Sequence, residues 1–546
     1  MKDLTPELFL SLKNYSTKDF TKDVIAGVIV AIIALPLSIA LALASGVPPE
    51  HGLYTAIVAG FVISAFGGSK VQIAGPTAAF ATIVAGIVAK NGMEGLAVAT
   101  ILAGIILVIM GLLRMGSMIK FIPSTITLGF TAGIAITIII GQLKDFLGLT
   151  FTTAPIETMD KLEQVISCFS TLNVAALGVG LFALFILILW PKVSKKIPAS
   201  LIAVIATAML VKVVDLPVNT IGDLYTISSA APTFHMPAIS YSTVAAVLPD
   251  AFTIAILAAI ESLLSAVVAD EMIDATHNSN MELIGQGLGN ASSALFGGIP
   301  ATGAIARTAA NIKNGGRTPV AGIVHAIVLL LVLVLLMPYA TLIPMPCIAA
   351  ILFQVAYNMS GWRNVVNTVK SSPKSDISVL VITFLLTVIF DLVIAIGVGL
   401  TLACLLFMKR MADVSHFKEW HYIDDDDETE NSRHKPVPDH VMVYEISGPM
   451  FFGATDKIPH MTKETHKSVL ILRMKGVPAL DITALNGLKQ LWHECKHQNI
   501  HVIFSHVNEQ PMSVFEKSGF KDYVGAENFV DNIDHALEYA ESFIQE

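Results

Sequence analysis

Residues 250–270 read DAFTIAILAAIESLLSAVVAD, an apolar run with one charged side chain, Glu261, near its middle. An α-helix rises about 1.5 Å per residue, so a run of this length crosses about 30 Å of hydrocarbon with Glu261 near the centre. A charge at that depth costs about 2.5–3.5 kcal/mol on insertion scales, so a carboxylate there normally faces a protected polar cavity. The stretch therefore predicts a membrane-spanning helix with a functional acid. The alternative is an acid that holds neighbouring segments together through hydrogen bonds.

The same apolar character recurs along most of the chain. Hydrophobic residues make up 54% of the 546 residues and charged residues 14%, which excludes an ordinary soluble protein. Long apolar stretches and shorter, Gly-broken ones together give fourteen crossings or half-crossings. The chain is therefore predicted to be a polytopic α-helical membrane protein. The expected segments are Val24–Ala44, Tyr54–Phe66, Ala74–Ala89, Leu96–Leu113, Ile122–Leu143, Val174–Trp190, Ile197–Val214, Ala251–Ala269, Leu283–Phe296, Gly303–Ile312, Val320–Met337, Pro346–Tyr357, Ile377–Asp391 and Leu392–Met408.

Basic residues orient these segments. With the N-terminus in the cytoplasm, most Lys and Arg of the connecting loops fall on the cytoplasmic side, as the positive-inside rule requires. Residues 1–23 are polar and no small-residue cleavage site follows them, so we expect the first span to be the targeting signal itself. Both ends of the membrane part, residues 24–411, are thus predicted to be cytoplasmic. The basic residues expected on the other side are Lys90, Lys144, Lys161 and Lys212.

Composition changes abruptly after Met411. Residues 412–436 contain the acidic run Asp424–Glu430 and are predicted to be an exposed linker, a solvated hinge rather than a docking segment. Residues 437–546 alternate strand and helix patterns, which is typical of an α/β domain with a mostly parallel sheet covered by helices. Strands are expected at Val441–Ser447, Ser468–Met474 and His501–Val507, and helices at Ala479–His497, Gln510–Ser518 and Val530–Ile544.

Two Gly-broken segments interrupt the membrane part, one in each half. Residues 71–86 read VQIAGPTAAFATIVAG and residues 297–312 read GGIPATGAIARTAANI. Each has an extended lead with Pro and Gly, followed by small residues that can begin a half-helix. The free N–H groups and positive dipole end of such a half-helix form an anion site. Paired interruptions point to the binding site of a transporter, whereas close helix packing is the alternative reason for the small residues.

Arg307 lies inside the second of these segments, four residues after Gly303. A cation near the end of a span can extend its head group to the interface. It can instead supply positive potential behind the half-helix and so favour an anion. Its place within the half-helix favours this second interpretation.

The remaining motifs exclude several other functions. The four cysteines, Cys168, Cys347, Cys404 and Cys495, are scattered without ligand spacing, so neither a disulfide framework nor a metal site is expected. No nucleophile–base constellation appears, which argues against an enzyme. The Gly-rich stretch at 285–290 is better explained by close helix packing than by phosphate binding. No cofactor and no nucleic-acid partner are expected.

Several of these motifs together resemble those of one family. The chain is similar over essentially its whole length to the SulP anion transporters, the bacterial relatives of solute carrier family 26. Within that family, the similarity is greatest to the branch of C4-dicarboxylate transporters. The matching stretches are ALPLSIALA at 34–42, GVPPEHGLY at 46–54, GPTAAF at 75–80, ESLLSAVVAD at 261–270, NMELIGQGLGN at 280–290 and FGGIPATGAIARTAANI at 296–312.

The resemblance implies a fold of seven-plus-seven inverted repeats, at about 24–214 and 250–411, divided into a core and a gate domain that move by alternating access. It implies that residues 437–546 form a cytoplasmic STAS domain, that the protein is a homodimer in the bacterial inner membrane, and that acyl carrier protein binds the STAS domain. It also implies a substrate site between the two half-helices. The implied substrate-binding residues are Thr77, Ala78, Ala79, Phe80, Gly303, Ala304, Ile305, Ala306 and Arg307.

The resemblance also bears on the coupling ion. Bicarbonate-transporting relatives carry Asp and Thr at a sodium site, where this chain has Glu261 and Ser265. This departure favours H⁺ over Na⁺ as the coupling ion. The predicted function is therefore secondary active, proton-coupled uptake of C4-dicarboxylates such as succinate, fumarate and aspartate. The alternatives are a bicarbonate or sulfate transporter, coupled to sodium or protons, and an uncoupled anion exchanger or channel.

In the C-terminal domain, residues 480–485 (LDITAL) occupy the position of a regulatory motif of the STAS family. By this resemblance Thr483 corresponds to the residue that is phosphorylated in anti-sigma factor antagonists, with Asp481 beside it. Asp481 is equally suited to be a plain helix N-cap, and this simpler role is the favoured one.

Overall fold

The computed structural model describes residues 4–544 except 118–122, 154, 156, 195–196, 391, 421, 424–434 and 454–466. The acidic run Asp424–Glu430 therefore lies outside the described residues. The chain divides into two compact units, Met1–Leu400 and Thr401–Glu546. The division falls within helix α17 (Leu392–Val414), so this helix contributes to both units.

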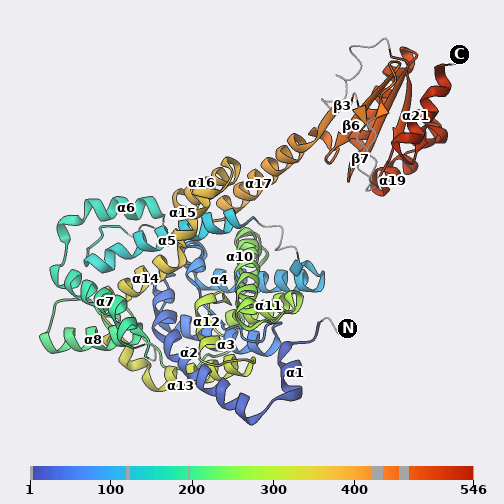
Figure 1. Ribbon diagram of the computed structural model, residues 1–546. Coiled ribbons are helices and arrows are strands. Elements are labelled where there is room, and N and C mark those ends of the chain that lie inside the picture. The colour runs from blue at the N-terminus through green and yellow to red at the C-terminus, as the bar shows by residue number, and fades with distance from the viewer. Residues whose placement is uncertain are drawn as a thin grey trace. The chain divides into compact units, whose positions relative to one another are not determined.

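Unit 1 is helical, and every predicted apolar segment contains a helix or a half-helix (Figure 1). Seven helices of the described residues are long and apolar enough to cross a membrane. The predicted segments Ala74–Ala89 and Leu96–Leu113 share helix α4 (Ala81–Leu112), which is interrupted at Gly92, where φ is 69°. The other main helices are α2 (Thr17–Ala44), α3 (Pro49–Phe66), α5 (Ser124–Leu147), α7 (Val174–Val193), α8 (Ala199–Val214), α10 (Tyr241–Ile273), α11 (Ser279–Leu295), α12 (Ile305–Lys313), α13 (Val320–Leu336), α14 (Met345–Met359) and α16 (Lys374–Ile389).

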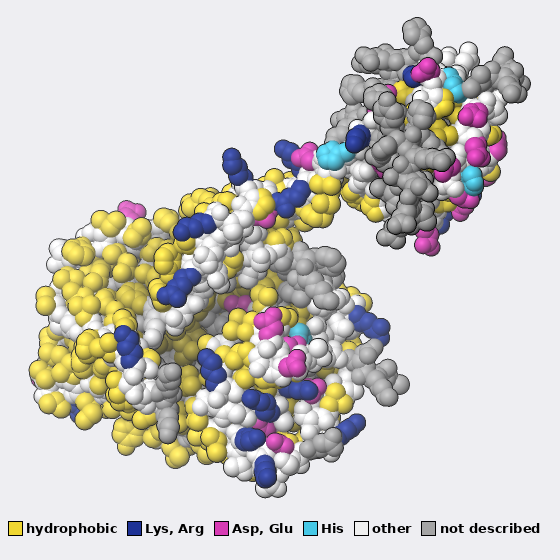
Figure 2. All heavy atoms as spheres, in the orientation of Figure 1, with side chains coloured by type: hydrophobic (Ala, Val, Ile, Leu, Met, Phe, Trp, Pro, Cys, Tyr) yellow, Lys and Arg dark blue, Asp and Glu magenta, His cyan; other side chains and the backbone are white. Residues whose placement is uncertain are grey.

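The surface of unit 1 fits a lipid environment. Large apolar side chains such as Val174, Phe185 and Val213 are well exposed on α7 and α8. Figure 2 shows hydrophobic side chains covering this side of the unit, while Lys and Arg gather elsewhere on the face drawn. Because water would disfavour so large an apolar surface, these helices are suited to face the membrane.

Glycines bring the helices at the centre of unit 1 close together. A Cβ atom added to Gly287 of α11 would lie 2.5 Å from the carbonyl oxygen of Gly104 on α4. One added to Gly285 would lie 2.6 Å from the Cα of Gly67, just after α3. Only glycine fits such contacts. The Gly-rich stretch at 285–290 is thus explained by helix packing, as predicted.

Unit 1 also contains two short, buried strands. Strand β1 (Ala74–Gly75) pairs antiparallel with β2 (Thr302–Gly303), with Ala74 opposite Gly303 and Gly75 opposite Thr302. Each strand leads directly into a helix: β1 into the 3-10 turn η3 (Ala78–Phe80) and α4, and β2 into α12. The pairing therefore joins the two Gly-broken segments that the sequence singles out.

Unit 2 is an α/β domain. Its five-stranded sheet has the order β3 (His416–Trp420), β6 (Val441–Ser447), β7 (Val469–Gly476), β8 (His501–Ser505) and β9 (Phe529–Val530). All neighbours are parallel except β3, which runs antiparallel to β6. Helices α18 (Ile482–His497), α19 (Glu509–Lys517) and α20 (Phe520–Val524) pack on one face of the sheet and α21 (Ile533–Glu541) on the other. Strand β3 differs from the prediction, which placed residues 416–420 in the linker.

Candidate functional site

The two half-helices begin at the same place because their leading strands are paired. Residue Thr77 precedes η3 and Ala304 precedes α12, and neither helix start has a side-chain N-cap hydrogen bond. Because the first N–H groups of a helix have no partner within the helix, both starts keep donors available. These donors and the positive dipole ends favour an anion between them.

A cavity of about 400 Å³ opens at these helix starts. Its lining comes from η3 with the two residues before it, from β2 and from helices α2, α5, α10, α12 and α14. The polar side chains of the lining are few: Thr77, Glu261, Arg307, Thr127, Thr131 and Asn358. The remaining lining residues are Leu37, Leu41, Pro76, Ala78, Phe130, Leu264, Gly303, Ala304, Ile305, Ala306, Ala309, Val355 and Met359.

Glu261 lines this cavity and also holds both half-helices. Its Oε2 accepts hydrogen bonds from the hydroxyl groups of Thr77, at 3.0 Å, and Thr302, at 2.9 Å. One residue later, the hydroxyl oxygen of Ser262 accepts a hydrogen bond from the backbone N–H of Gly303, at 3.0 Å. A single turn of α10 is therefore bonded to the lead of each half-helix. The packing role and the functional role considered for Glu261 are compatible in this geometry.

Arg307 is buried, with only 1% of its surface exposed, so it does not extend to the membrane interface. Its Nη2 donates to the carbonyl oxygen of Pro76, at 3.2 Å, and to Ser38 Oγ, at 3.3 Å. A Cβ atom added to Gly75 would lie 2.2 Å from Nη1, so the guanidinium lies directly behind β1. The positive charge carried by α12 therefore lies beside the residues that lead into the first half-helix. The sequence had predicted this charge behind the second half-helix.

Two nitrogen atoms of this guanidinium, Nε and Nη1, have no hydrogen-bond partner among the described residues, and Arg307 makes no ion pair there. A buried positive charge without a protein counter-ion is unfavourable unless a negative group comes near. The surroundings of Arg307 therefore favour a bound anion in the cavity that it lines.

Most of the predicted site residues meet at this cavity, and three do not. Ala79 and Phe80 are buried and do not line it, because the 3-10 turn η3 directs them into the protein. Ser265 is also buried away from the lining, and Leu264 takes its place one turn after Glu261. The predicted residues that do line the cavity are Thr77, Ala78, Glu261, Gly303, Ala304, Ile305, Ala306 and Arg307.

The sequence did not reveal the part of the cavity that α5 and α14 line. Thr127 and Thr131 are spaced four residues apart on α5, so they lie on one face of this helix. This polar pair is a signal that could have identified this part of the cavity. Asn358 lies in the last turn of the mostly apolar helix α14 and carries no comparable signal.

In unit 2, Asp481 is the N-cap of α18. One carboxylate oxygen accepts a hydrogen bond from the N–H of Ala484, at 2.8 Å, and the other from the N–H of Phe452, at 3.0 Å. Thr483 is exposed in the first turn of this helix. The geometry gives Asp481 the structural role favoured from the sequence, and regulation through Thr483 stays a prediction.

Comparisons with known proteins agree with this architecture. Residues 20–383 match the sulfate permease family and residues 432–536 match the STAS domain. The chain is 40% identical to a protein named putative sulfate transporter YvdB of Bacillus subtilis, over 96% of this chain and 98% of that one. It is 32% identical to a protein named bicarbonate transporter BicA of Picosynechococcus, over 88% of each.

Among solved structures, the murine solute carrier 26 family member A9 anion transporter, in an inward-facing state, has a similar fold, with a TM-score of 0.88. That alignment covers 99% of this chain and 94% of the murine one at 18% identity. That alignment includes residues of both units, and the two relatives named above carry the names of transporters. The chain belongs to the sulfate permease family of membrane anion transporters, with a STAS domain as its C-terminal unit.

Proposed function

We propose that this protein is a secondary active transporter that binds one small oxyanion between its two half-helix starts and carries it together with a proton on Glu261. The observation that carries the proposal is the place of Glu261, which lines the cavity and accepts hydrogen bonds from the leads of both half-helices. A second negative charge beside an ionised carboxylate in a low-dielectric cavity is strongly repelled. Binding of a proton to Glu261 removes this repulsion, so proton and anion bind together.

A compact anion of the sulfate or bicarbonate type fits this arrangement best. The β1–β2 pairing brings the two helix starts to a single point, where one anion can receive N–H donors from both. Two of the relatives carry the names of a sulfate and a bicarbonate transporter. In the cavity, Arg307 is the one cationic side chain among the described lining residues.

A C4-dicarboxylate is the second candidate substrate. The cavity extends from the helix starts to Thr127, Thr131 and Asn358, whose hydroxyl and amide groups can donate hydrogen bonds to a second carboxylate. The resemblance of the half-helix motifs to the dicarboxylate branch points to the same substrate class. Competition for uptake by sulfate, bicarbonate, succinate and fumarate distinguishes the two: the substrate is the anion that competes at the lowest concentration.

Transport in proteoliposomes tests the coupling. With a proton gradient, the wild-type protein should accumulate the anion against its own gradient, and Glu261→Gln should exchange anions without this pH-driven accumulation. A sodium gradient in place of the proton gradient should give no accumulation. If the proton gradient drives the same accumulation in Glu261→Gln as in the wild-type protein, the proposal is contradicted. Accumulation driven by a sodium gradient alone would identify sodium as the coupling ion.

We further propose that the protein lies in the bacterial inner membrane with residues 1–23 and the STAS domain in the cytoplasm. The distribution of Lys and Arg supports this orientation. Homodimer formation and binding of acyl carrier protein to the STAS domain remain predictions from the family resemblance. Cross-linking in native membranes and co-purification with acyl carrier protein test these two predictions separately.

A further inference from the structure

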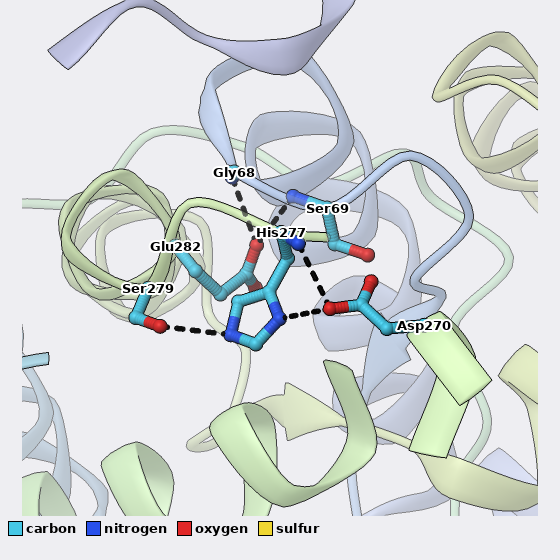
Figure 3. A network of polar contacts seen from close by, with 6 residues as sticks. All are labelled: Gly68, Ser69, Asp270, His277, Ser279 and Glu282. Carbon is cyan, nitrogen blue, oxygen red and sulfur yellow. Dashed lines mark hydrogen bonds and ion pairs between the residues drawn. The ribbon is translucent and has the colours of Figure 1, made fainter. Parts of the chain in front are cut away.

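A buried carboxylate that the proposed mechanism does not use holds the loop before the first half-helix. Glu282 of α11 is 1% exposed, and its Oε2 accepts hydrogen bonds from the backbone N–H groups of Gly68, at 2.9 Å, and Ser69, at 3.1 Å (Figure 3). Its Oε1 accepts from the side-chain amides of Gln72, at 2.6 Å, and Gln286, at 2.8 Å. Four N–H donors thus satisfy a carboxylate that makes no ion pair within the described part of the chain.

The start of α11 is itself tied to the end of α10, the helix that carries Glu261. Asp270 accepts hydrogen bonds from the backbone N–H of His277, at 2.8 Å, and from its Nδ1, at 2.7 Å. The other ring nitrogen of His277 contacts Ser279 Oγ at 2.9 Å (Figure 3). These hydrogen bonds fix the start of α11, and with it Glu282, relative to the end of α10.

Gln72 connects this anchor to the second half-helix. Its Nε2 is bonded to Glu282, and the same amide lies flat against Gly303: a Cβ added to Gly303 would meet Nε2 at 2.2 Å and Cδ at 2.4 Å. Gly303 lines the anion cavity and is followed by the first turn of α12. The Oε1 of Gln72 has no hydrogen-bond partner among the described residues. The same is true of Gln286 Oε1, so what distinguishes Gln72 is its close contact with Gly303.

We propose that Gln72, oriented by Glu282, is a positioning residue for the anion site. Its amide fixes Gly303, and with it the first turn of α12, without contacting the anion. This inference rests on the proposed anion site between the two half-helices. Because a misplacement of about 1 Å in a binding constellation can cost about 100-fold, a small shift of Gly303 is expected to weaken anion binding.

Gln286 offers a matched control. Gln72→Ala and Gln286→Ala each remove one N–H donor from Glu282 Oε1, but the three atoms nearest to a Cβ added at Gly303 all belong to Gln72. Anion dissociation constants of the full-length protein in detergent, measured with sulfate, bicarbonate and succinate, separate the two effects. We expect Gln72→Ala to weaken binding about tenfold and Gln286→Ala less than about twofold. Equal losses in the two variants, or no loss in Gln72→Ala, overturn the positioning role.

A size exchange tests the contact itself. Gly303→Ala should largely abolish anion binding, because the new methyl group collides with the amide of Gln72. The double variant Gln72→Ala/Gly303→Ala removes the collision and should bind the anion several-fold better than Gly303→Ala alone. A double variant that binds no better overturns the inference. If the wild-type protein binds none of the three anions, the proposed site fails and the inference fails with it, whereas wild-type binding with no recovery in the double variant refutes the positioning role alone.

Discussion

Two carboxylates illustrate how differently the same group is used in the two units. Both oxygens of Asp481 accept backbone N–H groups, those of Ala484 and Phe452, so its acceptor capacity serves the local backbone. Glu261 accepts two hydroxyl groups on one oxygen and faces a cavity. Hydroxyl groups can also accept hydrogen bonds, so the partners of Glu261 tolerate a change in its protonation, whereas backbone N–H groups require an acceptor.

At Asp481 this difference gives a direct prediction. Asp481→Ala removes the N-cap of α18 and leaves two N–H groups without their acceptor, so we expect it to lower the free energy of unfolding of unit 2 by about 1–2 kcal/mol. Thr483→Ala changes an exposed side chain and should alter it by less than about 0.5 kcal/mol. Chemical denaturation of both variants provides the measurement. Equal effects would mean that Asp481 does not act as a cap.

At the scale of single residues, the sequence identified Glu261 but not all of the residues that line the cavity with it. Glu261 stands out because a charge in the middle of an apolar run needs a protected site. The family resemblance placed Ser265 and Phe80 at the cavity, yet neither lines it, because the helical phase of α10 and the 3-10 turn η3 direct both away. Such rotations depend on packing, which the sequence does not display.

Among the elements, the contact between α4 and α11 depends on glycine. Gly104→Ala and Gly287→Ala each place a methyl group about 2.5 Å from a backbone atom of the facing helix, so we expect each to destabilise the protein by about 1–3 kcal/mol. Gly86→Ala, on α4 but with nothing within 4 Å of the added carbon, should be neutral or stabilise by about 0.5–1 kcal/mol. Thermal unfolding of the detergent-solubilised variants checks this order. A Gly86 variant that is as unstable as the other two would contradict it.

Segments of this chain were easier to predict than their pairing. The apolar runs gave the positions of the helices, because hydropathy over a span is a local property. The pairing of β1 with β2 joins residues far apart in the sequence, so only the recurrence of two Gly-broken segments hinted at it. Strand β3 was missed because five residues beside an acidic run carry too little alternation to be recognised.

For the molecule as a whole, the two units have separate cores. Unit 2 buries apolar side chains on both faces of its sheet, and it is large enough to fold alone. We therefore expect residues 412–546, expressed alone, to unfold cooperatively.

Burial, assisted by the nearby Glu494 carboxylate, raises the pKa of the Cys495 thiol to about 12. Since the thiolate is the reactive form, Cys495 should resist maleimide at pH 8 until the domain unfolds. Immediate labelling without denaturant would contradict an independent fold.

In the proposed mechanism, one anion and one proton share the site formed by the two half-helices and Glu261. Its most direct test is the exchange of protons with a weakly buffered solution when the substrate anion is added to the purified protein. We expect anion binding to take up protons in the wild-type protein, and we expect Glu261→Gln to bind the anion without proton uptake. Proton uptake of the same size in both proteins would exclude Glu261 as the proton site, because the proton would then be bound elsewhere.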